Sequence, residues 1–333
     1  MNSITLNESV CNEVGQLISV LGLRSSFYQR PFLTINAPTE TRLRGYYYAV
    51  AVCHQTYHLQ NQALGLYGWD YLEHVFTVLM EQQDSFLLPG KISSAGLQET
   101  CRKLAGLFSP NGSAGNTTLD RLEERANMLL ELDRFVMEKF NSSLEELNVS
   151  THNRLLNSGR GYYEILPSIP AFTDPMKKKI SFLLKLLEEA GLAEIRDAES
   201  FIPIMDYHMQ RVLLRMGCVE VTDPTLHSKL SMHLPLDTDE KIRSTCIQAF
   251  RIIARISGKA ITKLNDYFWS LGRSCCNTEP LCRFHHCEKV PCTFYEIVDL
   301  REHRSCLFSP ACKGYSDEKY RKLWQPVVET NFY

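Results

Sequence analysis

The chain has 333 residues, of which 44% are hydrophobic and 22% charged, and this composition is ordinary for a soluble globular protein with one large or two ordinary domains. No run of about 18 apolar residues occurs and MNSITLNESV has no basic start before an apolar core, so we expect no membrane span, no secretory signal and an intracellular protein of cytoplasm, nucleoid or nucleus. A net charge of −2 is unusual for a nucleic-acid-binding protein, although a local basic face can still attract phosphate.

The first half of the chain has the three- and four-residue apolar spacing that predicts helices. Such helices are expected over 42–60, 68–83 and 118–140. The segment 109–117, SPNGSAGNT, is a polar loop, and 158–176 contains enough proline and glycine to be irregular.

Further helices follow in the second half. One begins near Met176, with Asp174 as its cap and an apolar stripe of Ile180, Leu183, Leu184 and Leu187, and it ends at Gly191. Others begin near residue 205 and cover 238–256 and 260–271. Because no segment alternates convincingly, the expected fold class is all-α.

Seven of the twelve cysteines lie between residues 275 and 312. Clustering in a large chain without a signal peptide favours a metal site over a disulfide scaffold. The loop 272–292, GRSCCNTEPLCRFHHCEKVPC, has the spacing C-x6-C-x4-C-x4-C if Cys275 is the first ligand. Four thiolates can each bind one iron of a [4Fe-4S] cluster. The predicted ligands are Cys275, Cys282, Cys287 and Cys292.

Several alternatives to this ligand set remain open. Zinc could replace the cluster, bound by four cysteines or by three cysteines and one histidine. Cys276 could substitute for Cys275, and His285 or His286 for one of the cysteines. The two later cysteines, Cys306 and Cys312, are expected to be buried thiols, with the alternative that one of them is a ligand.

The entry to this loop, FWSLGRSCCNTEPLC, resembles the iron–sulfur loop of endonuclease III and adenine glycosylases, in which Leu-Gly precedes C-x6-C. Upstream, FIPIMDYHMQRVLLRMG (201–217) is similar to the segment of helix–hairpin–helix DNA glycosylases that carries their catalytic carboxylate. By this resemblance Asp206 is the catalytic aspartate, and His208 orients its segment. The order of the two elements is also that of the family.

A third segment, TDPMKKKISF (173–182), looks like the hairpin of archaeal 8-oxoguanine DNA glycosylases, whose lysine forms a covalent intermediate. This resemblance makes Lys178 the nucleophile, with Lys177 or Lys179 as substitutes. A target base must leave the duplex to be reached, so its pocket needs aromatic and edge-reading side chains. The candidates for this substrate-binding role are Gln55, Trp69 and Phe182.

The resemblance implies a two-lobed helical fold: an N-terminal extension (1–40), a glycosylase-like core (41–271), the cluster loop (272–292) and a tail (293–333). It also implies a monomeric base-excision repair enzyme that removes a modified base, expected to be a purine, from damaged duplex DNA. This activity is hydrolysis of the N-glycosidic bond. If Lys178 is the nucleophile, the enzyme would also cleave the DNA strand as a lyase. Two alternatives are an inactive iron–sulfur nucleic-acid-binding protein and an N-glycosidase that acts on RNA or a free modified nucleoside.

Overall fold

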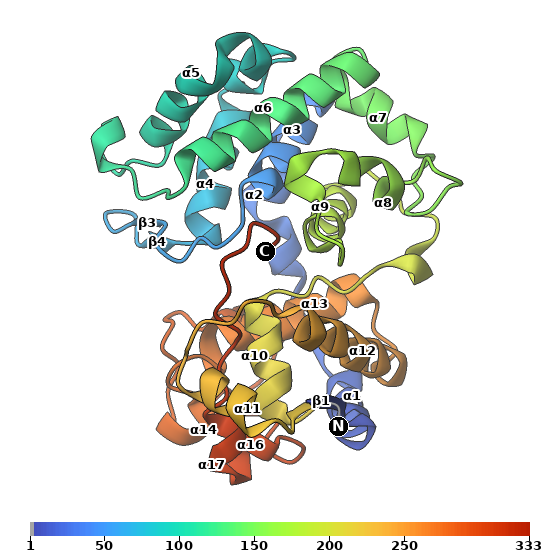
Figure 1. Cartoon of the computed structure of the whole chain (residues 1–333), viewed down its shortest axis with the longest axis vertical. Helices are drawn as coiled ribbons and strands as arrows, with labels where there is room; N and C mark the ends of the chain where they lie inside the picture. The colour runs from blue at the N-terminus through green and yellow to red at the C-terminus, as the bar shows by residue number, and fades with distance from the viewer. Residues whose placement is uncertain (1–2) are drawn as a thin grey trace. The chain divides into compact units, whose positions relative to one another are not determined.

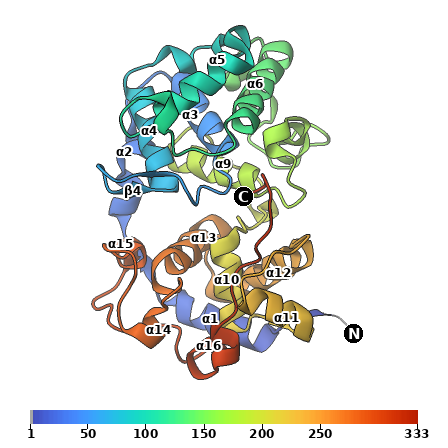
Figure 2. The same cartoon turned by 60° about the vertical axis from the view of Figure 1, so that its left-hand side comes forward.

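The structure is a computed structural model that describes residues 3–333. The chain divides into two compact units, each of which is discontinuous in sequence. Unit 1 contains the residues up to Tyr28 and Ile202–Glu329, and unit 2 contains Gln29–Phe201 and Thr330–Tyr333. Both are built mainly from helices (Figures 1 and 2), which confirms the mostly helical class. The strands described in residues 3–333 form three two-stranded antiparallel pairs.

Unit 2 is a helical bundle in which α3 packs against α4, α6, α7 and α9. A small β3–β4 hairpin precedes α4. The described elements are α2 (Pro31–Thr34), α3 (Thr39–Ala51), β3 (Gln60–Asn61), β4 (Leu66–Tyr67), α4 (Trp69–Glu81), α5 (Lys91–Leu107), α6 (Leu122–Lys139), α7 (Leu144–Ser150), α8 (Tyr162–Ile165) and α9 (Lys178–Glu189).

The helix predicted near Met176 is α9. The Asp174 side chain accepts hydrogen bonds from the amides of Met176 and Lys178 (3.0 and 2.9 Å), so it binds the first helical amide, although the N-cap position itself is Lys177. Regular helix begins two residues later than expected, because Lys177 adopts a left-handed conformation with φ of 57°. The predicted apolar stripe is fully buried.

The helix predicted over 42–60 is shorter than expected, since α3 ends at Ala51. The chain then turns, with Gln55 at a φ of 42°. The buried guanidinium of Arg125 in α6 donates hydrogen bonds to the carbonyl oxygens of Val52 and His54. These bonds to a distant helix satisfy backbone groups that a longer α3 would have used itself.

A buried ion pair fixes three helices of unit 2. Arg44 of α3 and Asp133 of α6 approach to 2.8 Å, and their side chains are 1% and 0% exposed. Asp133 also accepts hydrogen bonds from the Tyr48 hydroxyl and from the amide and hydroxyl of Ser93, at the start of α5. Both carboxylate oxygens of Asp133 are therefore hydrogen-bonded, as a buried charge requires.

Unit 1 surrounds α10, which packs against α12, α13, α16 and α17. A π-helical segment, η7, continues directly from α13. The described elements are β1 (Ile4–Leu6), α1 (Glu8–Ser19), β2 (Gly22–Leu23), α10 (Tyr207–Met216), β5 (Val219–Val221), α11 (Pro224–Ser231), α12 (Glu240–Ser257), α13 (Ile261–Ser270), η7 (Leu271–Cys275), α14 (Leu281–Phe284), α15 (Thr293–Ile297), β6 (Val298–Asp299), α16 (Lys313–Ser316) and α17 (Glu318–Arg321).

The start of the chain is an integral part of unit 1. Strand β1 pairs with β5, and α1 lies along α12. At Gly15 a Cβ atom would come within 2.8 Å of the Ile256 side chain, so glycine permits this close approach. Much of the predicted N-terminal extension therefore has a defined place in the core.

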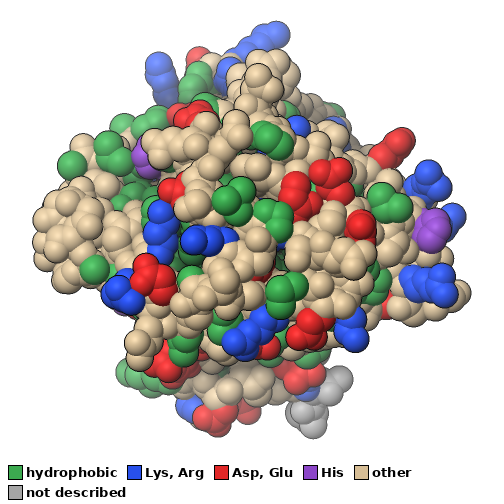
Figure 3. All heavy atoms as spheres, turned by 90° about the horizontal axis from the view of Figure 1, so that it is seen from above, with side chains coloured by type: hydrophobic (Ala, Val, Ile, Leu, Met, Phe, Trp, Pro, Cys, Tyr) green, Lys and Arg blue, Asp and Glu red, His purple; other side chains and the backbone are tan. Residues whose placement is uncertain are grey.

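No helix of the described residues is both long enough and apolar enough to cross a lipid bilayer. On the face shown in Figure 3, acidic and basic side chains are interspersed. This mixture agrees with the near-neutral net charge of −2.

Candidate metal centre and candidate catalytic residues

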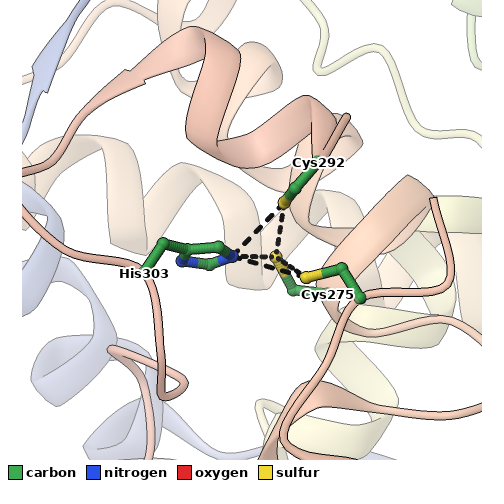
Figure 4. A group of neighbouring side chains, drawn as sticks. Cys275, Cys292 and His303 are labelled. Carbon is green, nitrogen blue, oxygen red and sulfur yellow. Dashed lines mark hydrogen bonds between the residues drawn. The ribbon is translucent and has the colours of Figure 1, made fainter. Parts of the chain in front are cut away.

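Cys275, Cys287, Cys292 and His303 form a group of possible metal ligands in unit 1. Their sulfur and nitrogen atoms all lie within 4.8 Å of one another. The Cys275 Sγ lies 3.5 Å from the Cys292 Sγ and 3.7 Å from the Cys287 Sγ. The Nε2 atom of His303 lies 3.1 to 3.5 Å from the three sulfurs, and Figure 4 shows it facing Cys275 and Cys292.

These distances correspond to ligands of a single ion. A tetrahedral zinc ion with Zn–S bonds of about 2.3 Å and a Zn–N bond of about 2.0 Å would separate two sulfurs by about 3.8 Å and a sulfur from the nitrogen by about 3.5 Å. The observed separations, 3.1 to 3.7 Å, are slightly smaller. The sulfurs of a [4Fe-4S] cluster bind four different irons and must lie further apart.

The four side chains come from separate turns around η7. Cys275 is its last residue, Cys287 lies after α14, and Cys292 directly precedes α15. The imidazole of His303 stacks on the ring of Tyr295 at a centroid distance of 6.0 Å. Packing therefore holds the imidazole in place.

The thiols of this group differ in proton affinity. Burial raises the pKa of Cys275, whereas hydrogen bonds from Cys275 and Cys287 hold the pKa of Cys292 well below its usual value. A thiolate thus forms readily at Cys292, and thiolates are the form of cysteine that binds metals. The Nδ1 atom of His303 is buried without a hydrogen-bond partner in the described structure.

The predicted ligand set is only partly brought together. Three of its members gather, but Cys282 is not in the group, and the fourth member of the group is His303. Cys282 lies inside the short helix α14, where its electrostatic neighbours are Cys276, Arg321 and Arg215. The alternative histidines, His285 and His286, are exposed and outside the group.

The sequence contained a signal for His303 that the prediction did not use. It lies 11 residues after Cys292, beyond the loop 272–292 to which the ligand search was confined. A search for three cysteines and a later histidine, which is a common zinc pattern, would have included it. The intervening α15 and β6 bring it back to the cysteines.

Two arginines of α10 hold the chain that leads into this group. The Arg211 guanidinium donates hydrogen bonds to the carbonyls of Gly272 (2.5 Å) and Cys276 (3.0 Å). The Arg215 guanidinium donates to the carbonyls of Cys276 and Asn277. Burial lowers the pKa of Arg211 to about 10, so it remains charged at neutral pH.

Asp206, the predicted catalytic carboxylate, is the N-cap residue of α10. Its Oδ1 atom accepts a hydrogen bond from the amide of Met209 (3.0 Å), and the residue is 9% exposed. An irregular segment, 201–206, leads into it and contains the buried Ile204 and Met205. The predicted orienting residue, His208, makes a contact of 3.2 Å from Nδ1 to the Nη2 atom of Arg211.

Lys178 and two predicted substrate-binding aromatics are neighbours in unit 2. The Lys178 ammonium lies 5.1 Å from the centroid of the Phe182 ring and 3.9 Å from the Sγ of Cys53. The Trp69 ring meets Phe182 edge-on at 4.8 Å, and its indole nitrogen donates to Glu73 (2.7 Å). Lys178 is 8% exposed, and both aromatic rings are half-buried.

The adjacent Lys179 is completely buried. Its ammonium donates to the carbonyl of Ala51 (2.7 Å) and lies 3.2 Å from the Nδ1 of His54. Burial lowers the pKa of Lys179 to about 7, and it also lowers the pKa of His54. The neutral imidazole of His54 therefore accepts a hydrogen bond from Lys179 at Nδ1. It donates a hydrogen bond through Nε2 to Glu124 (2.7 Å).

Gln55 is part of the internal structure of unit 2. Its Oε1 atom accepts hydrogen bonds from the Arg121 guanidinium (3.2 Å) and the amide of Thr330 (3.4 Å). The backbone amide of Gln55 donates a hydrogen bond to the backbone carbonyl of Tyr333. The residue predicted to read a base edge thus binds the end of the chain.

Unit 1 also contains a cavity of about 490 Å³. His233 stacks on Trp324 there at a centroid distance of 4.6 Å. The cavity has cationic and aromatic walls, which include Arg215, Arg283, Arg321, Lys322, Phe284 and Trp324. Sequence patterns did not indicate it, because its residues come from four separated segments.

A comparison with protein-family models gives no match to this chain, and no curated protein matches it.

Proposed function

We propose that this protein is a DNA glycosylase that cleaves the N-glycosidic bond of a modified base, expected to be a purine. The observation that carries the proposal is the largely buried carboxylate of Asp206 at the start of α10, after the irregular segment 201–206. The motif that suggested this role comprises the irregular segment 201–206 and the helix α10, which ends before the left-handed Gly217.

The reaction requires a negative charge near the sugar. Breaking the N-glycosidic bond builds positive charge on the sugar ring, and a fixed carboxylate stabilises that charge. The carboxylate of Asp206 is held by the amide of Met209, so its position does not depend on the substrate. It would stabilise the cation and orient the attacking group.

Lys178 is the proposed covalent nucleophile. An amine attacks the sugar carbon with its nitrogen lone pair. Lys178 is 8% exposed, whereas the amine of Lys179 is completely enclosed and already hydrogen-bonded to protein. A Schiff base at Lys178 would permit strand cleavage as a second activity.

A nucleic-acid substrate is supported by the cavity in unit 1. Arg283 can bind a phosphate, and the exposed Phe284 ring provides a stacking surface. This arrangement supplies a local basic site in a chain whose net charge is −2.

The group of Cys275, Cys287, Cys292 and His303 is proposed to bind a structural zinc ion. Three sulfurs and one nitrogen at single-ion distances are a common donor set for zinc, and four protein ligands leave no open position for catalysis. The ion would fix the segments around η7 and α15. This assignment replaces a [4Fe-4S] cluster bound by Cys275, Cys282, Cys287 and Cys292.

The test is base release from a panel of duplexes, each with one defined lesion. Asp206→Asn should abolish release but leave α10 intact, because asparagine caps helices as well as aspartate does. The matched control is Asp223→Asn, which changes the N-cap of α11 in the same way. Release by Asp206→Asn at the wild-type rate would refute the catalytic role.

Borohydride trapping tests the covalent step. A lesion duplex should give a protein–DNA adduct that Lys178→Gln abolishes and the neighbouring Lys177→Gln retains. Release without any adduct would restrict the activity to hydrolysis. Binding without release would favour an inactive nucleic-acid-binding protein, and release from RNA or nucleosides alone would favour the corresponding N-glycosidase.

A further inference from the structure

Four cysteines of the late cluster remain outside the Cys275, Cys287, Cys292 and His303 group. Seven cysteines lie between 275 and 312, and three of them belong to that group, which leaves four. All four are partly buried, and all belong to unit 1. We call them the second thiol group: Cys276, Cys282, Cys306 and Cys312.

Contacts with α10 bring two members of this group together. The Arg215 guanidinium lies 3.7 Å from the Sγ of Cys276, and the Sγ of Cys312 lies 3.7 Å from the carbonyl oxygen of the same arginine. Glycine at 314 allows this approach, since a Cβ there would come within 2.8 Å of the Arg215 carbonyl. Two thiols from positions 36 residues apart thus both contact Arg215, near the end of α10.

A compact turn links Cys306, the third member of the second thiol group, to Cys312. The amide of Ser309 donates to the carbonyl of Cys306 (3.2 Å), and that of Cys312 donates to Phe308 (2.8 Å). The residues between Cys306 and Cys312 therefore fold back on themselves. The fourth member, Cys282, lies in α14 beside Arg215 and Arg321.

The four thiols are electrostatic neighbours in every pairing. Cys276 and Cys282 interact electrostatically with each other. Cys306 and Cys312 also interact with each other, and each of these two interacts with both Cys276 and Cys282. Burial is the main cause that raises the pKa of Cys282, Cys306 and Cys312, the last to about 12. Burial keeps these thiols neutral, and a metal centre beside the cationic Arg215 would stabilise the thiolates that it binds.

Their spacing excludes a single ion. Within residues 3–333, the second thiol group is not gathered tightly enough to hold one metal ion, unlike the group that contains His303. A cluster that contains several metal ions binds each thiolate to a different iron and so suits wider spacing. The guanidinium of Arg215 would compensate negative charge and donate to the ligand sulfur of Cys276.

We propose that Cys276, Cys282, Cys306 and Cys312 bind a [4Fe-4S] cluster, which makes unit 1 a domain with two different metal centres. The adjacent residues Cys275 and Cys276 then serve different centres. This inference does not depend on the proposed glycosylase activity.

Metal analysis of the whole protein, purified without oxygen, tests the proposal. We expect about one zinc and, with full occupancy, about four irons and four sulfides per chain. Cys282→Ser and Cys306→Ser should lose most of the iron and its visible absorption and keep the zinc. Cys287→Ser should lose the zinc and keep the iron, and Cys101→Ser, a partly buried cysteine of unit 2, should change neither.

A second measurement covers variants that fold poorly. The wild-type protein is incubated with iron and sulfide under reducing conditions, and its exposed thiols are then alkylated and identified by mass spectrometry. Protection of all four cysteines of the second thiol group, together with the electron paramagnetic resonance signal of a reduced cluster, would support the proposal. Alkylation of these four at the rate of Cys101, or two zinc ions and no iron, would overturn it.

Discussion

At the scale of single residues, Lys179 makes the stability of the protein depend on pH. Its pKa is about 7 in the folded chain and about 10.5 when exposed to water. Between these values the unfolded chain binds one more proton, so stability should rise with pH from about 7 to about 10.5. Below pH 7 the lysine is charged in both states, and the cost of burying it is constant.

Lys179→Met should remove this dependence. The free energy of unfolding of the wild type should rise by up to about 1.4 kcal/mol for each pH unit relative to the variant. Urea unfolding of both proteins between pH 7.5 and about 10 measures the difference. The exposed Lys139→Met should follow the wild type, and parallel curves for Lys179→Met and the wild type would contradict the expectation.

The pair of Arg44 and Asp133 gives a second prediction. Asp133→Ala leaves the Ser93 amide without its acceptor and the buried Arg44 guanidinium with Glu40 as its remaining ionic partner, which should cost about 3 kcal/mol. Glu131→Ala, in the same helix, removes a surface ion pair with Arg134 and should cost less than about 1 kcal/mol. Equal losses in chemical denaturation would show that the buried pair is not important.

Individual ligands were predictable only where the sequence keeps them close together. Cys275, Cys287 and Cys292 lie within 18 residues and were identified from their spacing. The same spacing wrongly suggested that Cys282 joins them. Helix α14 holds Cys282 among other thiols, and His303 reaches the group through α15 and β6. Neither fact is visible in ligand spacing.

At the scale of secondary structure elements, η7 depends on its contact with α10. A Cβ atom at Gly272 would come within 2.8 Å of the His208 carbonyl oxygen, which belongs to the backbone and cannot move aside. The carbonyl oxygen of Gly272 also accepts a hydrogen bond from the Arg211 guanidinium (2.5 Å). Glycine therefore allows η7 to lie directly against α10.

Gly272→Ala should force the two elements apart and cost about 1 to 3 kcal/mol. Because Cys275 and Cys276 follow directly, the variant should also bind metal less tightly. Thermal unfolding and metal content measure these two effects. Gly115→Ala is the control, since its Cβ would meet nothing within 4 Å. An unchanged melting temperature and metal content for Gly272→Ala would contradict this account.

Helix positions were largely predictable and helix ends less so. The periodic patterns located α4, α6, α9, α10, α12 and α13 to within a few residues. The end of α3 was not visible because Arg125, which binds the carbonyls after it, lies more than 70 residues away. The π-helical geometry of η7 likewise depends on the arginines of α10.

At the scale of the whole molecule, metal removal should affect the two units differently. The metal ligands lie only in unit 1, which has little regular structure between 276 and 312. Chelation should raise hydrogen exchange in 271–312 and in α10, because metal binding stabilises the folded state. Helices α6 and α9 of unit 2 should keep their protection. A uniform increase in exchange over both units would contradict this prediction.

The class of fold was predictable from the sequence, but the division into units was not. Helical periodicity reports local structure, whereas β1 pairs with β5 across more than 200 residues. The segment 1–40 has no pattern that assigns its first part to the same unit as α12. Such pairings depend on packing that local sequence does not encode.

The pairing of β1 with β5 and of α1 with α12 has a consequence for biosynthesis. A ribosome makes β1 and α1 before their partners, which emerge only after some 200 further residues. At about 5 to 20 residues per second, the apolar face of α1 stays uncovered for at least about 10 seconds. During that interval the nascent chain offers chaperones a hydrophobic binding segment, and a fragment that starts at residue 202 would lack a helix of its own core.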